Sequence, residues 1–456
     1  MENKTIYYFK EISNIPRESG NEKEIAKYIG DFAKRKNLDY VIDKYNNVII
    51  RRYNENIESI ILQAHLDMVC EKDKDKEFDF TKDAIEVIEK DGFLMANGTT
   101  LGADNGIGVA QILNLLDTTN YPIEAIFTSS EETTMQGAEM IDLSSLKGKT
   151  MINLDGFDED TLLLESASFT DIYLHMNYEF KEKSNDLLKI TLSGLEGGHS
   201  GFNIDKGRGN SSILLANLLL KLENVQIAIF IGGSKLNVIP SLSEVIIKKN
   251  NHIKEVLENF INKERNNYPN LDIKVELSKE ERKLLTINDS KDFLNSISSF
   301  RHGVINKNKR YEVTTSENLG VVNLEKNILG VGLRSSIEEE RLSVINYLNN
   351  YCNKYNYGLE IQGFQPGFRT MEDSSLVKDL IKVYQEFNDN KPLLKSVHIG
   401  VEVGLLKEKI KDLEVVIISP KIIDAHSPSE RVDINSIKRC DEWLLRYLKN
   451  KYPTCK

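Results

Sequence analysis

The sequence predicts an α/β fold in which a mixed, mainly parallel sheet flanked by helices is interrupted by an inserted α+β domain. Apolar runs typical of buried strands alternate with helical patterns in the first part of the chain and again near its end. The middle part instead shows the period-two alternation of half-buried strands. At 456 residues the chain is also longer than one growing hydrophobic core supports. We therefore predict one domain from residues 1–170 and 369–456, and an inserted domain from residues 171–368.

The N-terminal part predicts two helices on either side of the turn IPRESGN, in which Asn21 is the expected cap of the second helix. VIDKYNNVIIRRY and SIILQAHLDMV follow as strands, and the second is a nearly continuous apolar run of the kind found in parallel sheets. GADNGIGVAQILNLLD predicts a tight loop that leads into an apolar helix. IEAIFTSS, GAEMIDL and TMINLDG then predict a strand, a helix and a strand. In such sheets ligands gather beyond the carboxyl ends of the strands.

The inserted part begins with the alternating segments DIYLHMNYEF and LLKITLSG and continues with GGHSG and the apolar helix SSILLANLLLKLENV. We expect most apolar residues of that helix to belong to the core of the insert. The final part, with SSLVKDLIKVYQEFND, HIGVEVGLL, LEVVIISP and SIKRCDEWLLRYLKN, returns to helix and buried-strand patterns. Within it, His398 and Glu402 share a helix face if their segment is helical.

Composition argues against several classes of partner. The formal net charge of -11 and the pI near 5.4 argue against binding to nucleic acid. The four cysteines have neither CxxC spacing nor the density of a disulfide scaffold, which fits a reducing compartment. The opening MENKTIYYFKEIS lacks an apolar signal region, and no apolar stretch reaches the roughly 18 residues of a membrane-spanning helix. We expect a soluble, cytoplasmic protein without a membrane or nucleic-acid partner.

Acidic and imidazole side chains follow the ends of the predicted strands and helix-loop junctions. They are His65 and Asp67 in QAHLDMV, Asp104 in TTLGADNGIG, Glu131 and Glu132 in FTSSEET, Asp155 in MINLDG, and His426 in IIDAHSPSERV. A pair of zinc ions bridged by one carboxylate needs two histidines, a shared aspartate, two further carboxylates and a glutamate that moves protons. The chain supplies this set without surplus, and the set predicts a two-metal hydrolase.

Each of these motifs alone also fits a simpler interpretation. His65 could be a buried histidine that bonds to the backbone, with Asp67 on the same face of its strand. Asp104 precedes a helix and could be an ordinary N-cap. Glu131 and Glu132 could be a solvated loop pair, although adjacent carboxylates repel unless a cation or a proton lies between them. Taken singly, Asp155 and His426 would also be structural.

Motifs along nearly the whole chain resemble one family, the bacterial aminoacyl-histidine dipeptidases. This is the peptidase D or carnosinase-like branch of the dinuclear zinc aminopeptidase and carboxypeptidase superfamily. The resembling segments are FKEISNIPRESGNE, HLDMVCEK, TTLGADNGIGVA, EETTMQGA, NLDG, GLEGGHSGFNI, GRGNS, TSENLGVV, HIGVEVG and HSPSERV. TTLGADNGIGVA together with GGHSG is a highly specific combination.

The resemblance implies two Zn²⁺ ions per chain, with Co²⁺ or Mn²⁺ as substitutes. Its implied ligand sets are His65, Asp104 and Asp155 for one ion, and Asp104, Glu132 and His426 for the other, with Asp104 shared. Glu131 would be the general base, and Asp67 would hold His65. The resemblance also implies a cis peptide bond between Asp104 and Asn105.

The same resemblance implies that the insert is a lid domain through which two chains form a homodimer. His199 of GGHSG would stabilise the oxyanion of the tetrahedral intermediate. The implied or suggested substrate contacts are Asn210, Asn237, Arg334, His398 and Glu402. The guanidinium of Arg334 could bind a substrate carboxylate with two hydrogen bonds, or could form an ordinary salt bridge.

The implied activity is that of a cytosolic zinc dipeptidase that hydrolyses Xaa-His and other unblocked dipeptides with metal-activated water. One alternative is a peptidase or deacylase of the same superfamily that acts on longer peptides or N-acyl amino acids. Another is a non-catalytic binding protein that retains the fold. The chain departs from the family pattern at Ala64, Phe368, Ile399 and Val403, where Gly, Trp, Ala and Cys are usual. These departures concern the substrate pocket and leave the implied metal ligands intact.

Overall fold

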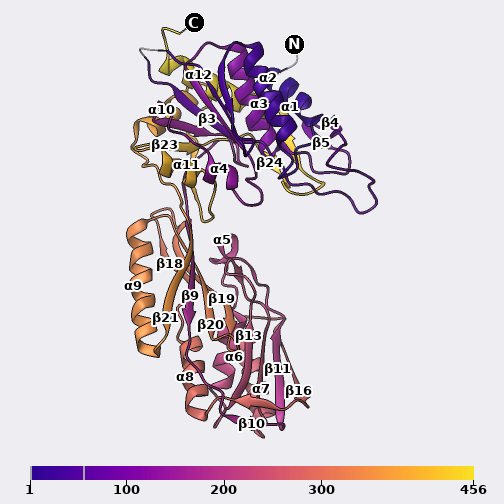
Figure 1. Cartoon of the computed structure of the whole chain (residues 1–456), viewed down its shortest axis with the longest axis vertical. Coiled ribbons are helices and arrows are strands. Elements are labelled where there is room, and N and C mark those ends of the chain that lie inside the picture. The colour runs from indigo at the N-terminus through magenta and orange to yellow at the C-terminus, as the bar shows by residue number, and fades with distance from the viewer. Residues whose placement is uncertain (1–2, 55–56, 456) are drawn as a thin grey trace. The chain divides into compact units, whose positions relative to one another are not determined.

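The computed structural model describes residues 3–54 and 57–455, which form two compact units (Figure 1). The first unit contains the described residues up to Glu165, Phe368–Ser396, and those from Val401 onward. The second unit contains Ser166–Gly367 and the short segment Val397–Gly400. A long insertion into the first unit thus forms a body with its own core, and each unit is described below by itself.

The first unit is built on a mixed sheet with the order β1-β2-β6-β3-β7-β23-β8-β22. Its central strands β6, β3, β7 and β23 run parallel to one another, whereas the pairs β1–β2, β2–β6 and β23–β8 are antiparallel. This confirms the predicted mainly parallel sheet. The strands are β1 (Asp39–Ile42), β2 (Val48–Arg51), β3 (Ile60–His65), β6 (Ile123–Thr128), β7 (Thr150–Asn153), β8 (Thr161–Ser166), β22 (Leu393–Val397) and β23 (Glu414–Ile417).

Helices cover both faces of this sheet because alternate strand residues point to opposite sides. In β3, Ile60 and Leu62 pack into the core beneath one group of helices, while Ile61 packs into a separate core beneath the other. The first group contains α1 (Lys4–Ser13), α2 (Lys23–Arg35), α3 (Ala103–Thr118), α10 (Ser375–Tyr384) and α12 (Ile434–Lys451). The second contains α4 (Gln136–Met140) and α11 (Val403–Lys409). Burial on both faces accounts for the continuous apolar run of β3.

A second, small antiparallel sheet in the first unit holds the loop that contains His426. Its order is β24-β25-β5-β4. The strands are β4 (Val87–Lys90), β5 (Phe93–Ala96), β24 (Ile422–Ile423) and β25 (Arg431–Asp433). His426 lies in the loop between β24 and β25, so pairing of β25 with β5 anchors that loop to the N-terminal half of the chain.

One local prediction in the first unit is wrong, and the helix considered for His398 and Glu402 is absent. Helix α2 begins with Glu22 as its N-cap, without a side-chain capping bond, so Asn21 is not the cap. Glu22 Oε1 instead accepts hydrogen bonds from Gly20 N and Ser130 N. The segment from His398 to Glu402 is not helical, because β22 ends at Val397 and α11 begins at Val403. His398 and Glu402 therefore share no helix face.

The second unit contains an antiparallel sheet with helices packed against it, which confirms the predicted α+β insert. Its order is β16-β11-β15-β13-β19-β20-β9-β21, and β18 pairs with β19. The strands are β9 (Ser168–His175), β11 (Leu187–Ser193), β13 (Ile227–Gly232), β15 (Ser243–Lys248), β16 (Asp272–Ser278), β18 (Gly303–Lys307), β19 (Val313–Asn323), β20 (Ile328–Ser335) and β21 (Gly358–Gln365). Shorter pairs are β10 (Glu182–Ser184) with β17 (Arg282–Leu284), and β12 (Gly198–His199) with β14 (Val238–Ile239).

The helices of the second unit supply much of its apolar core. They are α5 (Ser200–Asn203), α6 (Ser211–Leu219), α7 (Ile253–Glu264), α8 (Ile287–Ser298) and α9 (Glu338–Tyr355). Leu214, Leu215, Leu218 and Leu219 of α6 are buried in this core, as predicted for the apolar helix. The helix ends at Leu219, earlier than the sequence pattern suggested.

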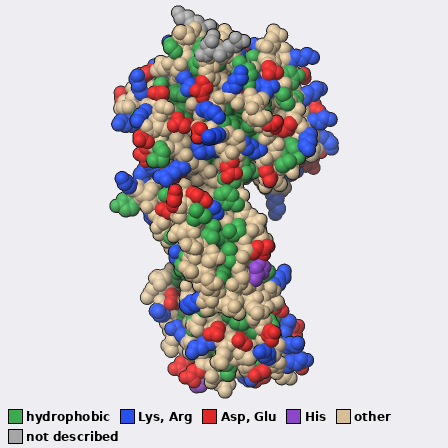
Figure 2. Space-filling view, turned by 60° about the vertical axis from the view of Figure 1, so that its left-hand side comes forward, with side chains coloured by type: hydrophobic (Ala, Val, Ile, Leu, Met, Phe, Trp, Pro, Cys, Tyr) green, Lys and Arg blue, Asp and Glu red, His purple; other side chains and the backbone are tan. Residues whose placement is uncertain are grey.

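Two further features are the distribution of charged side chains on the surface and the length and polarity of the helices. On the face seen in Figure 2, acidic and basic side chains are interspersed over both units. Within residues 3–54 and 57–455, no helix is both long enough and apolar enough to cross a membrane.

Candidate metal centre

Asp104 lies between two histidines that come from opposite ends of the sequence. Its Oδ1 is 3.0 Å from Nε2 of His65, which ends strand β3. Its Oδ2 is 3.0 Å from Nε2 of His426, in the loop between β24 and β25. Each carboxylate oxygen of Asp104 therefore faces a different imidazole. This is the arrangement expected of a carboxylate that is shared between two cations.

A further carboxylate lies beside each histidine. Oε1 of Glu132 is 3.1 Å from His426 Nε2, although Oε1 is buried and accepts no hydrogen bond of good geometry. Oδ1 of Asp155 is 3.8 Å from His65 Nε2. Among the described residues, His65, Asp104 and Glu132 can offer ligand atoms that all lie within 4.8 Å of one another. Nitrogen and carboxylate oxygen are donors suited to zinc, so the residues fit a divalent cation.

The sheet explains why these residues meet. His65 is the last residue of β3, and the Glu131–Glu132 turn follows the neighbouring parallel strand β6. Asp155 comes two residues after β7, which pairs with β3 on its other side. Carboxyl ends of parallel strands lie at one edge of the sheet, which places the three segments together.

Asp104 itself lies in a distorted start of α3. Gly102, the N-cap, has a φ of 68°, and Asp104 and Asn105 have non-helical backbone angles. The predicted cis peptide bond between Asp104 and Asn105 is present. Asp104 is thus not an ordinary N-cap, and its side chain is directed by an irregular turn.

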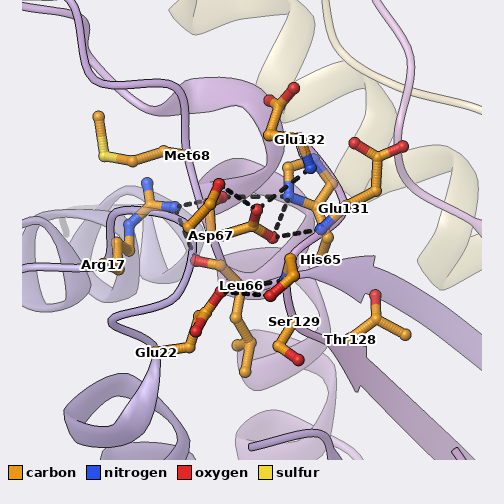
Figure 3. A network of polar contacts seen from close by, with 12 residues as sticks. Arg17, Glu22, His65, Leu66, Asp67, Met68, Thr128, Ser129, Glu131 and Glu132 are labelled. Carbon is orange, nitrogen blue, oxygen red and sulfur yellow. Dashed lines mark hydrogen bonds and ion pairs between the residues drawn. The ribbon is translucent and has the colours of Figure 1, made fainter. Parts of the chain in front are cut away.

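Asp67 contacts both His65 and the turn that carries Glu131 and Glu132. One of its oxygens lies 3.4 Å from His65 Nδ1, and the two oxygens accept hydrogen bonds from the backbone N–H groups of Glu131 and Glu132 at 3.0 and 3.2 Å. Ser19 Oγ also donates to Asp67, at 2.7 Å. Figure 3 shows Asp67 between Arg17 and the turn that carries Glu131 and Glu132. Asp67 therefore couples the orientation of His65 to the position of that turn.

Several carboxylates lie close together in the buried centre, and their proximity and burial shift the pKa values of its side chains. Burial raises the pKa of Glu131 to about 8. The charge of His65 acts in the opposite direction, and the charges of Glu402 and Glu132 add to the increase. Burial and the charge of Asp104 raise the pKa of Asp155 well above its ordinary value. Hydrogen bonds to Asp104 and Glu132 raise the pKa of His426 to about 10. The group as a whole attracts positive charge, as a cation site must.

Glu402 lies beneath the centre and not on its surface. It is 0% exposed, and its Oε1 accepts hydrogen bonds from Gln63 Nε2 at 2.5 Å and Thr128 Oγ1 at 2.9 Å. Gln63 and Thr128 belong to β3 and β6. The sheet thus supplies both hydrogen-bond donors to Oε1, and contact of Glu402 with substrate stays a prediction.

The remaining predicted contacts lie in the second unit. His199 Nδ1 accepts a hydrogen bond from Gly201 N at 3.1 Å, and its Nε2 is 3.3 Å from Arg334 Nη2. Arg334 Nε donates to Ser200 Oγ at 3.1 Å, and its guanidinium lies 4.4 Å from the ring centre of Phe169. Burial, and then the charge of Arg334, lowers the pKa of His199 to about 4. His199 is thus a neutral imidazole held beside a cation.

Asn210, Asn237 and His398 have local partners in the second unit. Asn210 caps α6 by accepting from Ser212 N and Ile213 N, and its Nδ2 donates to Leu319 O at 2.9 Å. The carbonyl of Asn237 accepts from Ser200 N at 2.8 Å, next to His199. His398 Nε2 lies 2.7 Å from Ser316 Oγ. The Asn210 side chain thus joins the start of α6 to β19, and its contact with substrate stays a prediction.

The sequence interpretation assigned no function to Arg17, Gln63 or Glu430. Arg17 and Glu430 are 2% exposed, Gln63 is 0% exposed, and all three bond to segments that carry the candidate ligands. All three stand in motifs already noted, which are IPRESGN, QAHLDMV and HSPSERV, and these motifs were the available signal.

Three of the four departures from the family pattern lie in the core of the first unit. Ala64 in β3 is 0% exposed, and Val403 at the start of α11 is 1% exposed. Phe368 is also buried there.

Comparisons with known proteins agree with this geometry. The chain is 32% identical to the cytosol non-specific dipeptidase of Escherichia coli (strain K12) over 458 residues, which covers 94% of this chain and 93% of that protein. The crystal structure of aminoacylhistidine dipeptidase from Vibrio alginolyticus matches with a TM-score of 0.84 and 29% identity, over 98% of this chain and 96% of the other. A tripeptidase from Staphylococcus aureus shares the fold, with a TM-score of 0.57 and 15% identity over 99% of this chain and 98% of the other.

Residues 61–450 match peptidase family M20/M25/M40. This range contains the five candidate ligands together with Asp67 and Glu131. The match and the E. coli relative confirm the resemblance inferred from the motifs, and the chain belongs to peptidase family M20/M25/M40.

Proposed function

We propose that the protein is a metal-dependent dipeptidase that hydrolyses unblocked dipeptides, with Xaa-His dipeptides among its substrates. The observation that carries this proposal is the position of Asp104, whose two oxygens each lie 3.0 Å from a different histidine. Membership of a peptidase family and the dipeptidase names of the E. coli and Vibrio relatives support the reaction and the length of the substrate.

The proposed centre takes two divalent cations, which we propose to be Zn²⁺, with Co²⁺ or Mn²⁺ as substitutes. His65, Asp104 and Asp155 would hold one, and Asp104, Glu132 and His426 the other. When bound, such cations lower the pKa of a water from about 15.7 to about 7 and polarise a carbonyl oxygen. The short distances among His65, Asp104 and Glu132 support a compact centre.

Glu131 is the proposed general base and acid. It is adjacent to Glu132, and burial gives it a raised pKa, so its carboxylate binds a proton readily. Glu131 accepts a proton from water as the new oxygen–carbon bond forms. It then delivers the proton to the leaving nitrogen as the carbon–nitrogen bond breaks. Asp67 contributes by fixing the backbone of Glu131 and the ring of His65.

The second unit is the proposed lid, with residues 171–368 as its proposed extent and a homodimer as its proposed assembly. His199 would donate a hydrogen bond to the oxyanion of the tetrahedral intermediate. Arg334, held by Ser200 and Phe169, would bind the C-terminal carboxylate of a dipeptide. His398, which lies beside Ser316, and Asn237, whose carbonyl accepts from Ser200 N, are further proposed substrate contacts. Asn210 and Glu402 complete the proposed set. A cytoplasmic location belongs to the same proposal and is supported by the name of the E. coli relative.

The decisive experiment combines metal analysis with a substrate panel. The purified full chain is assayed with Xaa-His, Xaa-Gly, tripeptide and N-acetylated substrates, before and after removal of metal by a chelator. We expect about two metal equivalents per chain and metal-dependent hydrolysis of unblocked dipeptides. Preference for tripeptides or N-acyl amino acids would favour the alternative enzyme. Less than about one equivalent without hydrolysis of any substrate would favour a binding protein that retains the fold.

A further inference from the structure

Two buried charged side chains, Arg17 and Glu430, lie behind the loop that carries Asp104. Arg17 is in the turn between α1 and α2, and Glu430 is four residues after His426. Each is 2% exposed. A buried charge is strongly unfavourable unless it is paired and hydrogen-bonded. The groups that these two side chains bind therefore indicate what they do.

Glu430 binds the backbone immediately around Asp104. Its Oε2 accepts hydrogen bonds from Leu101 N at 2.8 Å and Gly102 N at 2.9 Å, and its Oε1 accepts one from Asp104 N at 3.2 Å. These N–H groups lie at the start of α3, where they have no partners within the helix and where the helix dipole favours a carboxylate. Both carboxylate oxygens of Glu430 thus bind the loop and fix its path.

Arg17 binds the same loop from its carbonyl side. Its Nη2 donates to Gly102 O at 2.5 Å, and its Nη1 donates to Leu66 O at 3.0 Å and to Asp67 O at 3.2 Å. Figure 3 shows Arg17 beside Leu66 and Asp67. Because a guanidinium is a rigid planar group, these bonds set the spacing between the Asp104 loop and the turn that follows His65.

Two glycines make room for the guanidinium. A Cβ atom at Gly102 would lie 2.4 Å from Arg17 Nη2, and one at Gly106 would lie 2.6 Å from the same atom. Gly102 also has a φ of 68°, which disfavours other residues. The glycines on both sides of Asp104 are therefore needed for Arg17 to reach the loop.

We propose that Arg17 and Glu430 are positioning residues that hold Asp104 between His65 and His426 and thereby set the affinity of the centre for divalent cations. The inference rests on the proposed function. The candidate ligands come from five parts of the chain, and these two side chains join three of them: the turn after β3, the start of α3, and the loop after β24. The side chain of Asp104 is short, so its oxygens follow its backbone. Loss of such outer partners typically weakens metal binding by about 10- to 100-fold.

The test uses conservative variants of the full chain. Arg17→Lys keeps the charge but cannot bond to Gly102 and Leu66 together, and Glu430→Gln keeps the shape but leaves one N–H without an acceptor. We expect each variant to bind Zn²⁺ and Co²⁺ about 10- to 100-fold more weakly than wild type in competition with a chelator. We also expect an altered visible spectrum of the Co²⁺ form. Arg446→Lys and Glu442→Gln, which alter an ion pair on α12, are the matched controls and should keep wild-type affinity.

Thermal melting separates positioning from general stability. If the two residues position Asp104, the rise in Tm on addition of Zn²⁺ is smaller in the variants than in wild type, because the rise depends on affinity. Equal losses of Tm with and without Zn²⁺, together with wild-type affinity, would overturn the proposal. So would failure of both metal-free variants to fold, since the pair would then serve the fold itself. Absence of metal binding by wild type would instead reject the proposed function.

Discussion

Glu317 in the second unit gives a prediction whose magnitude follows from its surroundings. It is 0% exposed, Arg301 Nε donates to its Oε2 at 2.8 Å, and its Oε1 has no hydrogen-bond partner. Burial raises the pKa of Glu317 to about 7, even though the charge of Arg301 and its hydrogen bond act in the opposite direction. The ordinary value is 4.5. One half-satisfied ion pair thus does not offset the burial of the carboxylate.

The sign of the resulting pH dependence is determined by where the proton is held. Between pH 4.5 and 7 the folded protein keeps the proton of Glu317, whereas the unfolded chain releases it. The free energy of unfolding therefore decreases as pH rises through this window and levels off above it. Between pH 5.5 and pH 8 this one group lowers the stability by about 2 kcal/mol. The variant Glu317→Gln has no carboxyl group and lacks this contribution.

The measurement is urea denaturation at pH 5.5 and pH 8, followed by circular dichroism, with hydrogen exchange of β19 peptides to identify the unfolding of the second unit. We expect Glu317→Gln to gain about 2 kcal/mol relative to wild type on going from pH 5.5 to pH 8. Glu244→Gln is the control, because Glu244 lies in the same sheet on β15 but is 39% exposed beside Lys189. A difference between wild type and Glu317→Gln that is the same at both pH values would refute the reasoning.

Three further predictions concern the candidate centre. Glu131→Gln should lower kcat by about 10²- to 10⁴-fold while metal content stays at the wild-type level; loss of metal in parallel with activity would make Glu131 a ligand instead. Removal of metal by a chelator should abolish hydrolysis and lower the free energy of unfolding, by about 2.7 kcal/mol relative to a state with free metal at 100 times its Kd. An unchanged Tm after complete removal would contradict this. Gln63→Leu removes the donor to Thr128 Oγ1 and Glu402 Oε1, so we expect a loss of about 1–3 kcal/mol in urea denaturation. Wild-type stability would show that Glu402 finds another partner.

The gathering of the candidate ligands was predictable because it depends on local pattern and sheet geometry. Strand β3 is a continuous apolar run that ends at His65, and β6 and β7 show the same pattern before Glu131 and Asp155. Parallel strands present their carboxyl ends at one edge, so residues distant in sequence meet there. His426 could not be placed in this way, because it arrives through the small sheet formed by β24, β25, β5 and β4. Its prediction rested on the number of ligands that a two-metal site needs and on the family resemblance.

The sequence could not predict the surroundings of residues whose partners come from distant segments. Glu402 is a predicted substrate contact, and the structure places Gln63 and Thr128 from β3 and β6 against its carboxylate. Asn210 is another, and the structure shows that it also caps α6 and bonds to Leu319. The sequence of a motif is the same whether its polar side chain faces solvent or is buried. Only its hydrogen-bond partners distinguish the two cases.

The sequence by itself determined which segments are strands and helices, which family the chain resembles, and which acids and imidazoles follow the strand ends. These properties depend on apolar periodicity and on short motifs, which are local. The tertiary structure alone decided that each oxygen of Asp104 faces a different histidine, and that Arg17 and Glu430 bind the loop from behind. These properties depend on distances between segments up to 329 residues apart. They arise because burial leaves backbone N–H and carbonyl groups that only long-range packing can supply with partners.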